Sequence, residues 1–280
     1  MKQKKLAYFF VIPMCIILFI FLILPISTNF AISLFDINNN PKNWFDSTPS
    51  FYNYILALRQ DGFINAVKNS IIYTMVTTIC STTIGLFMAL CISNPFKGRS
   101  IAISLIMISW ALPSFVVGLF FGTLFQMEML NPQWIVGENA IFAVAVPAIW
   151  HYFPYSMLLF LVGLNSVKSD VNDAAIMDGA KNWEKFFYIT LPILKPVFIA
   201  VFVQNFIINI YSFNIIVMMF GGGTIIPGKG ADMLMPYIFR TAFQYWNLGV
   251  GAALSMMLMT VVGVAILFYY RRLKIDNYGV

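Results

Sequence analysis

The chain has 280 residues, of which 60% are hydrophobic and only 10% charged, and its mean hydropathy is +0.81. This composition has too little polar surface for a soluble globule of that length, so we expect an integral membrane protein. The net charge of +6 comes from basic residues scattered near the ends of apolar stretches rather than gathered in one patch, which argues against nucleic-acid binding.

Membrane-spanning helices are expected where an interval without Asp, Glu, Lys or Arg is long enough to cross the hydrocarbon core, which takes roughly 20 residues. The intervals that qualify are Leu6–Phe35, Asn69–Phe96, Ser100–Met127, Asn139–Val167, Pro196–Gly228 and Thr241–Tyr270. The first follows basic residues as a signal peptide would. Its apolar run is too long for one and lacks a small-residue cleavage site, so we read it as the first helix. We therefore predict an all-α membrane protein with six transmembrane helices, forming a single domain over residues 1–280.

The basic residues predict the orientation of this bundle. When alternate loops are assigned to opposite sides, twelve Lys and Arg residues fall on one side and five on the other. The five are Lys42, Arg59, Lys68, Lys229 and Arg240. The side with twelve is cytoplasmic by the positive-inside rule. Both termini and the loop between the fourth and fifth spans are then expected in the cytoplasm.

Three segments are expected on the external side. The first, Asp36–Lys68, contains turn-forming residues followed by a possible short surface helix over Phe51–Leu58. The other two are Met127–Asn139 and the stretch around Gly221-Gly222-Gly223. All three are too short to form a separate domain.

The cytoplasmic loop over residues 168–195 is the most patterned part of the chain. Asp170 at an N-cap position and Asp173 in the first turn are expected to begin a short helix, because carboxylates stabilise the positive end of the helix dipole. Gly179 marks the place where that helix ends or packs closely.

A second short helix is expected directly after the first. Asn182 can cap it, and it would carry Trp183. Pro192 and Pro196 are then expected to break the path before the fifth span. The pattern predicts a compact helix-turn-helix projection into the cytoplasm.

The order of residues in this projection resembles the EAA loop of permease subunits in binding-protein-dependent ABC importers, in the version seen in carbohydrate (maltose and glycerol-phosphate type) importers. The matching residues are Asp173, Ala174, Ala175, Asp178, Gly179, Ala180, Trp183, Phe186, Ile189, Leu191, Pro192 and Pro196. Asp173 stands where the family usually has Glu, and the carboxylate is kept. Gly221-Gly222-Gly223 stands where relatives often have Gly-Gly-Pro.

The resemblance implies a type I ABC importer permease fold in a bacterial or archaeal cell membrane. It implies a second, homologous permease subunit, two ATP-binding subunits and an extracytoplasmic substrate-binding protein as partners. In that family the loop is the coupling helix that sits in a cleft on the ATP-binding subunit. Its implied contacts here are Asp173, Ala174, Ala175, Asp178, Gly179, Ala180, Trp183, Leu191 and Pro192. The chain has no phosphate-binding loop of its own. We therefore expect no enzymatic activity and no bound cofactor in this chain, with ATP and Mg on the partner subunits.

Polar groups within the spans indicate what passes through. Asn205, Asn209 and Ser212 are predicted to share one face of the fifth helix, where they either bind helices together or line a passage. Neutral amides and hydroxyls suit the hydroxyl groups of a sugar, whereas a phosphate or carboxylate would favour Arg or Lys. The other candidates for the substrate path are Tyr211, Trp150 and Tyr155.

The alternative is a secondary transporter or a passive channel subunit for a small polar solute. His151 is the only ionisable residue of the Asp, Glu, Lys, Arg or His types in the six intervals. We read it as a hydrogen-bonded core residue, since no second His or nearby carboxylate supports a metal site or a proton relay. The three cysteines lie within spans without metal-ligand spacing, and no catalytic constellation is present. A requirement for ATP hydrolysed by a separate subunit would distinguish the importer from the alternative.

Overall fold

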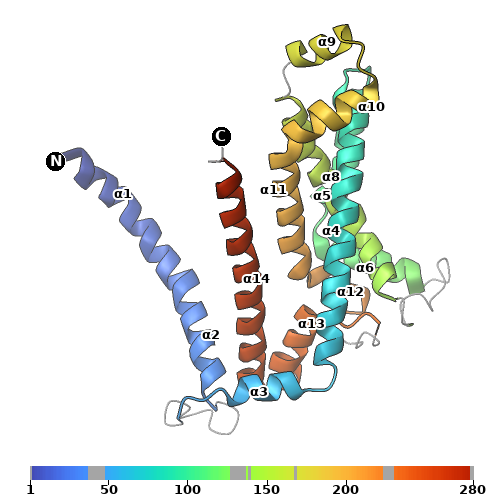
Figure 1. Cartoon of the computed structure of the whole chain (residues 1–280). Coiled ribbons are helices and arrows are strands. Elements are labelled where there is room, and N and C mark those ends of the chain that lie inside the picture. The colour runs from blue at the N-terminus through green and yellow to red at the C-terminus, as the bar shows by residue number, and fades with distance from the viewer. Residues whose placement is uncertain are drawn as a thin grey trace. The chain divides into compact units, whose positions relative to one another are not determined.

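The computed structural model describes residues 2–36, 48–126, 137, 140–166, 169–222 and 230–277, and the regular structure in these ranges is helical (Figure 1). The chain divides into two compact units: unit 1 is Met1–Ile64 with Tyr237–Val280, and unit 2 is Asn65–Pro236. Among the described residues, five helices are long and apolar enough to cross a membrane, and a bent helix pair brings the number to six if it counts as one span. The predicted all-α fold is confirmed.

Unit 1 contains both ends of the chain. Its elements are α1 (Lys2–Leu18), a π-helical turn (Phe19–Ile23), α2 (Leu24–Leu34), α3 (Tyr52–Arg59), a second π-helical turn (Arg240–Gln244) and α14 (Leu248–Asn277). The predicted surface helix is confirmed as α3. The Nδ2 of Asn53 on α3 donates to the carbonyl oxygens of Ser33 at 3.1 Å and Phe35 at 3.0 Å. These carbonyls lie at the end of α2, where backbone oxygens have no helical partner. Asn53 therefore ties α3 to α2.

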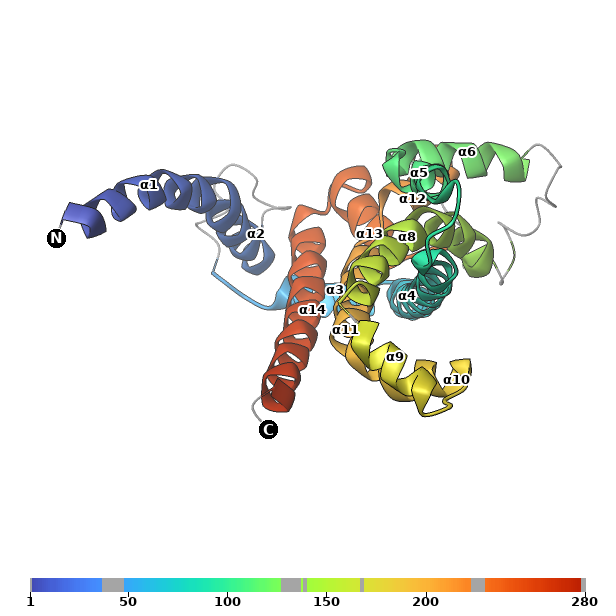
Figure 2. The ribbon, with the colours of Figure 1, turned by 90° about the horizontal axis from the view of Figure 1, so that it is seen from above.

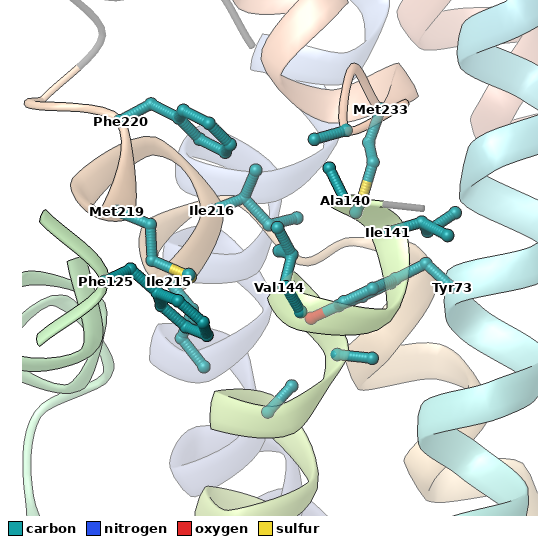
Figure 3. Close-up of a cluster of buried hydrophobic side chains, with 14 residues drawn as sticks. Tyr73, Phe125, Ala140, Ile141, Val144, Ile215, Ile216, Met219, Phe220 and Met233 are labelled. Atoms are coloured by element: carbon teal, nitrogen blue, oxygen red, sulfur yellow. The ribbon is translucent and has the colours of Figure 1, made fainter. Parts of the chain in front are cut away.

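Unit 2 holds the candidate site. Its elements are α4 (Phe63–Ser93, from Asn65), α5 (Arg99–Ala111), α6 (Ser114–Gln126), α8 (Ala140–Leu164), α9 (Ser169–Met177), α10 (Asn182–Lys185), a π-helical turn (Phe186–Thr190), α11 (Leu191–Ile210) and α12 (Asn214–Met219), while α13 (Leu234–Phe239) crosses the boundary between the units. An apolar cluster with side chains such as Tyr73, Val144 and Ile216 joins α4, α8 and α12 (Figure 3). Gly85 lets α4 approach α8 closely, because a Cβ there would lie 2.5 Å from the Cβ of Ser156.

The third expected span differs from a single helix. The structure has two helices, α5 and α6, bent by 87° at Leu112-Pro113 (Figure 2). Proline disfavours the helical conformation in the residue before it, and Leu112 is extended, with φ −69° and ψ 141°. Pro113 also has no N–H to continue the helical hydrogen bonds. The prediction of one crossing over Ser100–Met127 missed this break.

The fifth span begins and ends earlier than predicted. One helical stretch runs over Asn182–Ile210, with both Pro192 and Pro196 inside it, so the expected break at these prolines is wrong. Just before Pro192, the backbone N–H of Leu191 donates to the carbonyl of Phe186 in a π-helical turn. This wider turn accommodates the proline without ending the helix. A Leu-Pro pair, Leu24-Pro25, also follows the π-helical turn Phe19–Ile23 in unit 1.

Candidate functional site

The first helix of the predicted two-helix projection is α9, which begins at Ser169, one residue before the predicted cap Asp170. Its end is held by backbone hydrogen bonds of 3.0 Å from Gly179 to Ile176 and from Ala180 to Ala175. This bonding pattern requires a left-handed residue just past the helix end. Gly179 supplies it, with φ +76°. The helix therefore ends where the sequence predicts, and the reason is backbone conformation.

The second helix, α10, begins at Asn182, so Asn182 is its first residue and the prediction that it caps the helix is wrong. The cap is Lys181, whose backbone N–H donates to Oε2 of Glu184 at 2.6 Å. A carboxylate three residues into a helix commonly accepts from the capping residue in this way. In Figure 1, α9 and α10 lie at one end of unit 2, beyond the ends of α8 and α11.

The projection exposes apolar side chains. Met177 is 87% exposed, Trp183 55% and Tyr188 74%. Ala174, Asp178, Gly179 and Pro192 are exposed too, Ala180 and Leu191 are half-buried, and Ala175 is buried. The side chain of Asp173 lies outside the described residues. An exposed apolar surface on a segment otherwise rich in polar residues suits contact with another protein. The docking role of the individual residues stays a prediction.

Asn205 and Asn209 are buried on α11. The Nδ2 of Asn205 donates to Oγ1 of Thr82 on α4 at 3.1 Å and to Oγ of Ser156 on α8 at 2.8 Å. Asn209 donates from Nδ2 to the carbonyl oxygen of Asn205 at 2.8 Å. Asn205 on α11 is thus hydrogen-bonded to α4 and to α8. This is what we expect if these residues bind helices together. The place of Asn205 and Asn209 on the substrate path stays a prediction.

Ser212 and Tyr211 lie outside the helix on which they were predicted. α11 ends at Ile210, and both residues belong to the irregular segment before α12. Ser212 is buried and its Oγ lies 3.1 Å from the hydroxyl of Tyr73 on α4. Tyr211 is partly exposed. The predicted single stripe of three polar residues is therefore divided between a helix and a break.

The candidates on α8 separate into two aromatic contacts. The ring of Tyr155 stacks on Trp110 of α5, with centroids 5.1 Å apart and planes at 18°. Trp150 meets Phe121 of α6 edge to face at 5.7 Å. Offset stacking and edge-to-face contacts are the favourable geometries for aromatic pairs.

His151 is a hydrogen-bonded core residue, as predicted. It is buried, and its Nδ1 donates to the carbonyl oxygen of Ser109 at 2.7 Å. In a continuous helix that oxygen would accept from the residue four positions later. Here that residue is Pro113, which has no N–H. His151 therefore satisfies the carbonyl that the bend leaves without its usual partner.

The break between α5 and α6 lies close to the break between α11 and α12. The Nδ2 of Asn214, at the start of α12, donates to Oγ of Ser114, at the start of α6, at 3.3 Å. Further along, a Cβ on Gly118 would lie 2.5 Å from the carbonyl oxygen of Ile215, so the backbones of α6 and α12 are in close contact. A Cβ on Gly122 would lie 2.9 Å from the carbonyl oxygen of Met219.

We call this region the junction. It comprises the two breaks with the side chains beside them: Trp110, Ser114, Tyr155, Tyr211 and Asn214. Sequence reasoning named Tyr155 and Tyr211 but missed the other three. Two signals were available: Pro113 in the middle of an apolar interval, and the Gly118-x-x-x-Gly122 spacing, which favours close helix packing. Interrupted membrane helices often mark the substrate site of a transporter.

An all-helical membrane bundle with interrupted spans and a two-helix projection is the architecture of a permease subunit. Over residues 81–274 the chain matches the family described as binding-protein-dependent transport system inner membrane component. The chain belongs to this family and is a transport subunit.

Relatives agree along nearly the whole chain. The chain is 31% identical over 278 residues to the trehalose/maltose transport system permease protein MalF of Thermococcus litoralis. The match covers 93% of this chain and 91% of that protein. It is 25% identical over 282 residues to the sn-glycerol-3-phosphate transport system permease protein UgpA of Rhizobium meliloti, covering 96% and 94%.

Solved structures share the fold. A chain of a bacterial ABC transporter involved in the import of the acidic polysaccharide alginate matches with a TM-score of 0.80 at 18% identity, covering 97% of this chain and 96% of that one. A chain of the MetNI methionine ABC transporter matches with a TM-score of 0.59, covering 75% and 94%. The predicted importer permease fold is confirmed.

Proposed function

We propose that this chain forms part of the passage of an ATP-driven importer for a neutral sugar or oligosaccharide. The observation that carries the proposal is the junction, where the stacked pair of Trp110 and Tyr155 precedes the break between α5 and α6, and Ser114, just after that break, accepts a hydrogen bond from the amide of Asn214. Aromatic faces suit the apolar faces of sugar rings, and neutral amides and hydroxyls suit their hydroxyl groups. Trp110 is 41% exposed and Tyr211 37%, so the rest of this chain does not cover either side chain completely.

A neutral substrate is favoured by the distribution of charge. No Lys or Arg occurs between Arg99 and Lys168, which includes α6 and α8, or between Lys195 and Lys229, which includes most of α11 and α12. Recognition of a carboxylate or phosphate depends largely on charge-assisted hydrogen bonds from such residues. A sugar acid or sugar phosphate would find none on α6, α8 or α12, and none on α11 after Lys195. The names of the sugar permeases among the relatives support a carbohydrate substrate.

In the same proposal, ATP hydrolysis drives transport, and α9 and α10 transmit its effect to the passage. In this proposal, two ATP-binding subunits carry ATP and Mg, this chain binds no cofactor, and the exposed side chains of Met177 and Trp183 contact one of those subunits. A second, similar permease subunit completes the passage, and an extracytoplasmic binding protein delivers the sugar. Support comes from a structural neighbour that was crystallised with an alginate pentasaccharide-bound periplasmic protein. Both termini then face the cytoplasm, as the basic residues favour.

The test is uptake by the assembled transporter over a panel of radiolabelled sugars, comparing neutral sugars with sugar acids and sugar phosphates. Tyr155→Ala and Trp110→Ala should each lower uptake of the preferred sugar about 3- to 10-fold, since an aromatic contact contributes about 0.5–1.5 kcal/mol. Phe142→Ala is the matched control, because Phe142 is an exposed aromatic residue elsewhere on α8. The proposal would be contradicted if Tyr155→Ala and Trp110→Ala took up the sugar as well as Phe142→Ala does. A preference for charged sugars would contradict it too.

A further inference from the structure

Buried hydroxyl and amide groups gather on α4, α8 and α11 and just after α11, and we call this set the polar seam. Every member is at most 8% exposed. Its members are Tyr73, Thr74, Thr77, Thr78, Ser81 and Thr82 from α4, Ser156 from α8, Asn205 and Asn209 from α11, and Ser212. Such a concentration of polar groups inside an apolar bundle is costly unless each group finds a hydrogen-bond partner.

Direct hydrogen bonds close the two ends of the seam. At one end, Asn205 donates to Thr82 and Ser156. At the other, the hydroxyls of Tyr73 and Ser212 are 3.1 Å apart. From the Asn205 end to the Ser212 end of the seam, residue numbers rise along α11 and fall along α4, so the two helices run antiparallel. Asn209 therefore lies between the two ends, at the level of the middle of the α4 strip.

The middle of the seam is different. Oγ1 of Thr74, Oγ1 of Thr78, Oγ of Ser81 and Oδ1 of Asn209 are buried and make no hydrogen bond within the part of the chain that the structure describes. In the described part of the chain, six buried side-chain oxygen atoms make no hydrogen bond, and these four are among them. The Nδ2 of Asn209 is already held by the carbonyl of Asn205, which leaves its Oδ1 to face another partner. Buried groups of this kind usually bind ordered water or an ion.

We propose that the middle of the polar seam is a binding site for a short file of internal water molecules. Water can donate to Oδ1 of Asn209 and can both donate to and accept from the threonine and serine hydroxyls. A cation fits less well, because the seam contains no carboxylate. Thr74 and Ser81 are seven residues apart, about 10 Å along a helix, so a single water cannot serve them all. The inference concerns unit 2 alone and does not depend on which solute the transporter carries.

The site makes part of the contact between α4 and α11 indirect. Bridging waters exchange partners without leaving a buried group unpaired. The two helices can therefore change their spacing at the level of Asn209 while the direct bonds of Asn205 hold. This water lies one or two helical turns from the segment that carries Tyr211 and Ser212, beside the proposed passage.

The sign of a stability change tests the proposal. Thr78→Val keeps the shape of the side chain and removes its hydroxyl. If water binds there, the variant leaves that water short of a partner, and the melting temperature of the purified complex should fall by about 2–4 °C. If the hydroxyl has no partner at all, its removal should raise the melting temperature. Thr77→Val is the matched control, because Oγ1 of Thr77 is equally buried and donates to the carbonyl of Tyr73 at 2.7 Å.

A cryo-electron microscopy map that resolves ordered water gives the direct measurement. We expect peaks within hydrogen-bond distance of Oγ1 of Thr78 and Oδ1 of Asn209. The proposal is overturned if Thr78→Val raises the melting temperature, or leaves it unchanged while Thr77→Val, which loses a direct hydrogen bond, lowers it. It is also overturned if the map shows Thr78 bonded directly to Asn209, or a peak with oxygen distances of about 2.4 Å, which would be a cation.

Discussion

Replacing Gly179 should uncouple ATP hydrolysis from transport through strain in the backbone. At φ +76° the residue is in the left-handed region, and a Cβ added there would meet nothing within 4 Å. Alanine at this position therefore acts by conformation and not by collision within the chain. A residue with a side chain in this region destabilises the turn by about 1–2 kcal/mol, which shifts the local equilibrium by a factor of about 5–30.

The expected order of variants follows from this reasoning. Gly179→Asn should be tolerated best, since asparagine adopts the left-handed conformation more readily than most residues. Gly179→Ala should lower the amount of sugar transported per ATP hydrolysed by severalfold. Gly179→Trp should be worse than alanine if a partner subunit packs against this turn, because only the tryptophan adds bulk. The ratio is measured with the complex in proteoliposomes, by following labelled sugar and released phosphate together.

Gly98 supplies the control. It also has a left-handed backbone, with φ +89° and open space around the Cβ position, but it precedes α5 and lies outside the projection. Gly98→Ala should lower the melting temperature without changing the sugar transported per ATP. If Gly179→Trp assembles and transports normally, the docking model is refuted. If Gly98→Ala uncouples as strongly as Gly179→Ala, the effect is general instability.

Three further predictions concern topology, Asn205 and the bend. The topology is tested in a variant without the native cysteines Cys15, Cys80 and Cys91. A cysteine at Lys181 should react with an impermeant thiol reagent only after the cells are opened, and one at Arg59 should react in intact cells. The reverse pattern would invert the orientation. Asn205→Ala should lower the melting temperature of the complex by several degrees, because it removes two hydrogen bonds of about 1 kcal/mol each, and it should leave the substrate ranking unchanged; an altered ranking would instead assign Asn205 to the passage. His151→Leu should destabilise the complex by about 1–3 kcal/mol, since the carbonyl of Ser109 loses its buried partner, and His151→Gln should restore part of the loss; equal stability of the two variants would contradict the role of His151 at the bend.

The sequence predicts the features of this fold that depend on composition and local pattern. Intervals without charge identify the membrane-crossing segments, because the hydrocarbon core excludes charge regardless of how the helices pack. The end of α9 at Gly179 is likewise local, since a glycine after a short helix favours the left-handed cap. Turn-forming residues similarly precede the short surface helix predicted over Phe51–Leu58, which the structure shows as α3.

The features that the sequence analysis missed depend on how a helix accommodates proline. Pro113, Pro192 and Pro196 look alike in sequence. The first ends a helix, with its orphaned carbonyl satisfied by His151 from α8. The other two remain inside one helical stretch, and a π-helical turn directly precedes Leu191-Pro192. That choice depends on tertiary partners and on a backbone adjustment that no local pattern encodes.

The candidate site shows the same limit. Asn205, Asn209 and Ser212 have helical spacing, and spacing alone cannot reveal that α11 ends at Ile210. The pairing of Trp110 with Tyr155 joins residues on different helices. It follows from the packing of α5 against α8, which no local pattern encodes, and the contact of Ser114 with Asn214 likewise joins segments far apart in the sequence.

The central claim is that this permease moves a sugar inward with energy from ATP hydrolysed on partner subunits that contact α9 and α10. The most direct test is sugar uptake into proteoliposomes that contain the complete complex, with the binding protein outside and ATP supplied only on the side that carries α9 and α10. We expect accumulation above the external concentration that stops when ATP is replaced by a non-hydrolysable analogue. Uptake that continues without ATP hydrolysis, either down the sugar gradient or driven by a proton gradient, would contradict it.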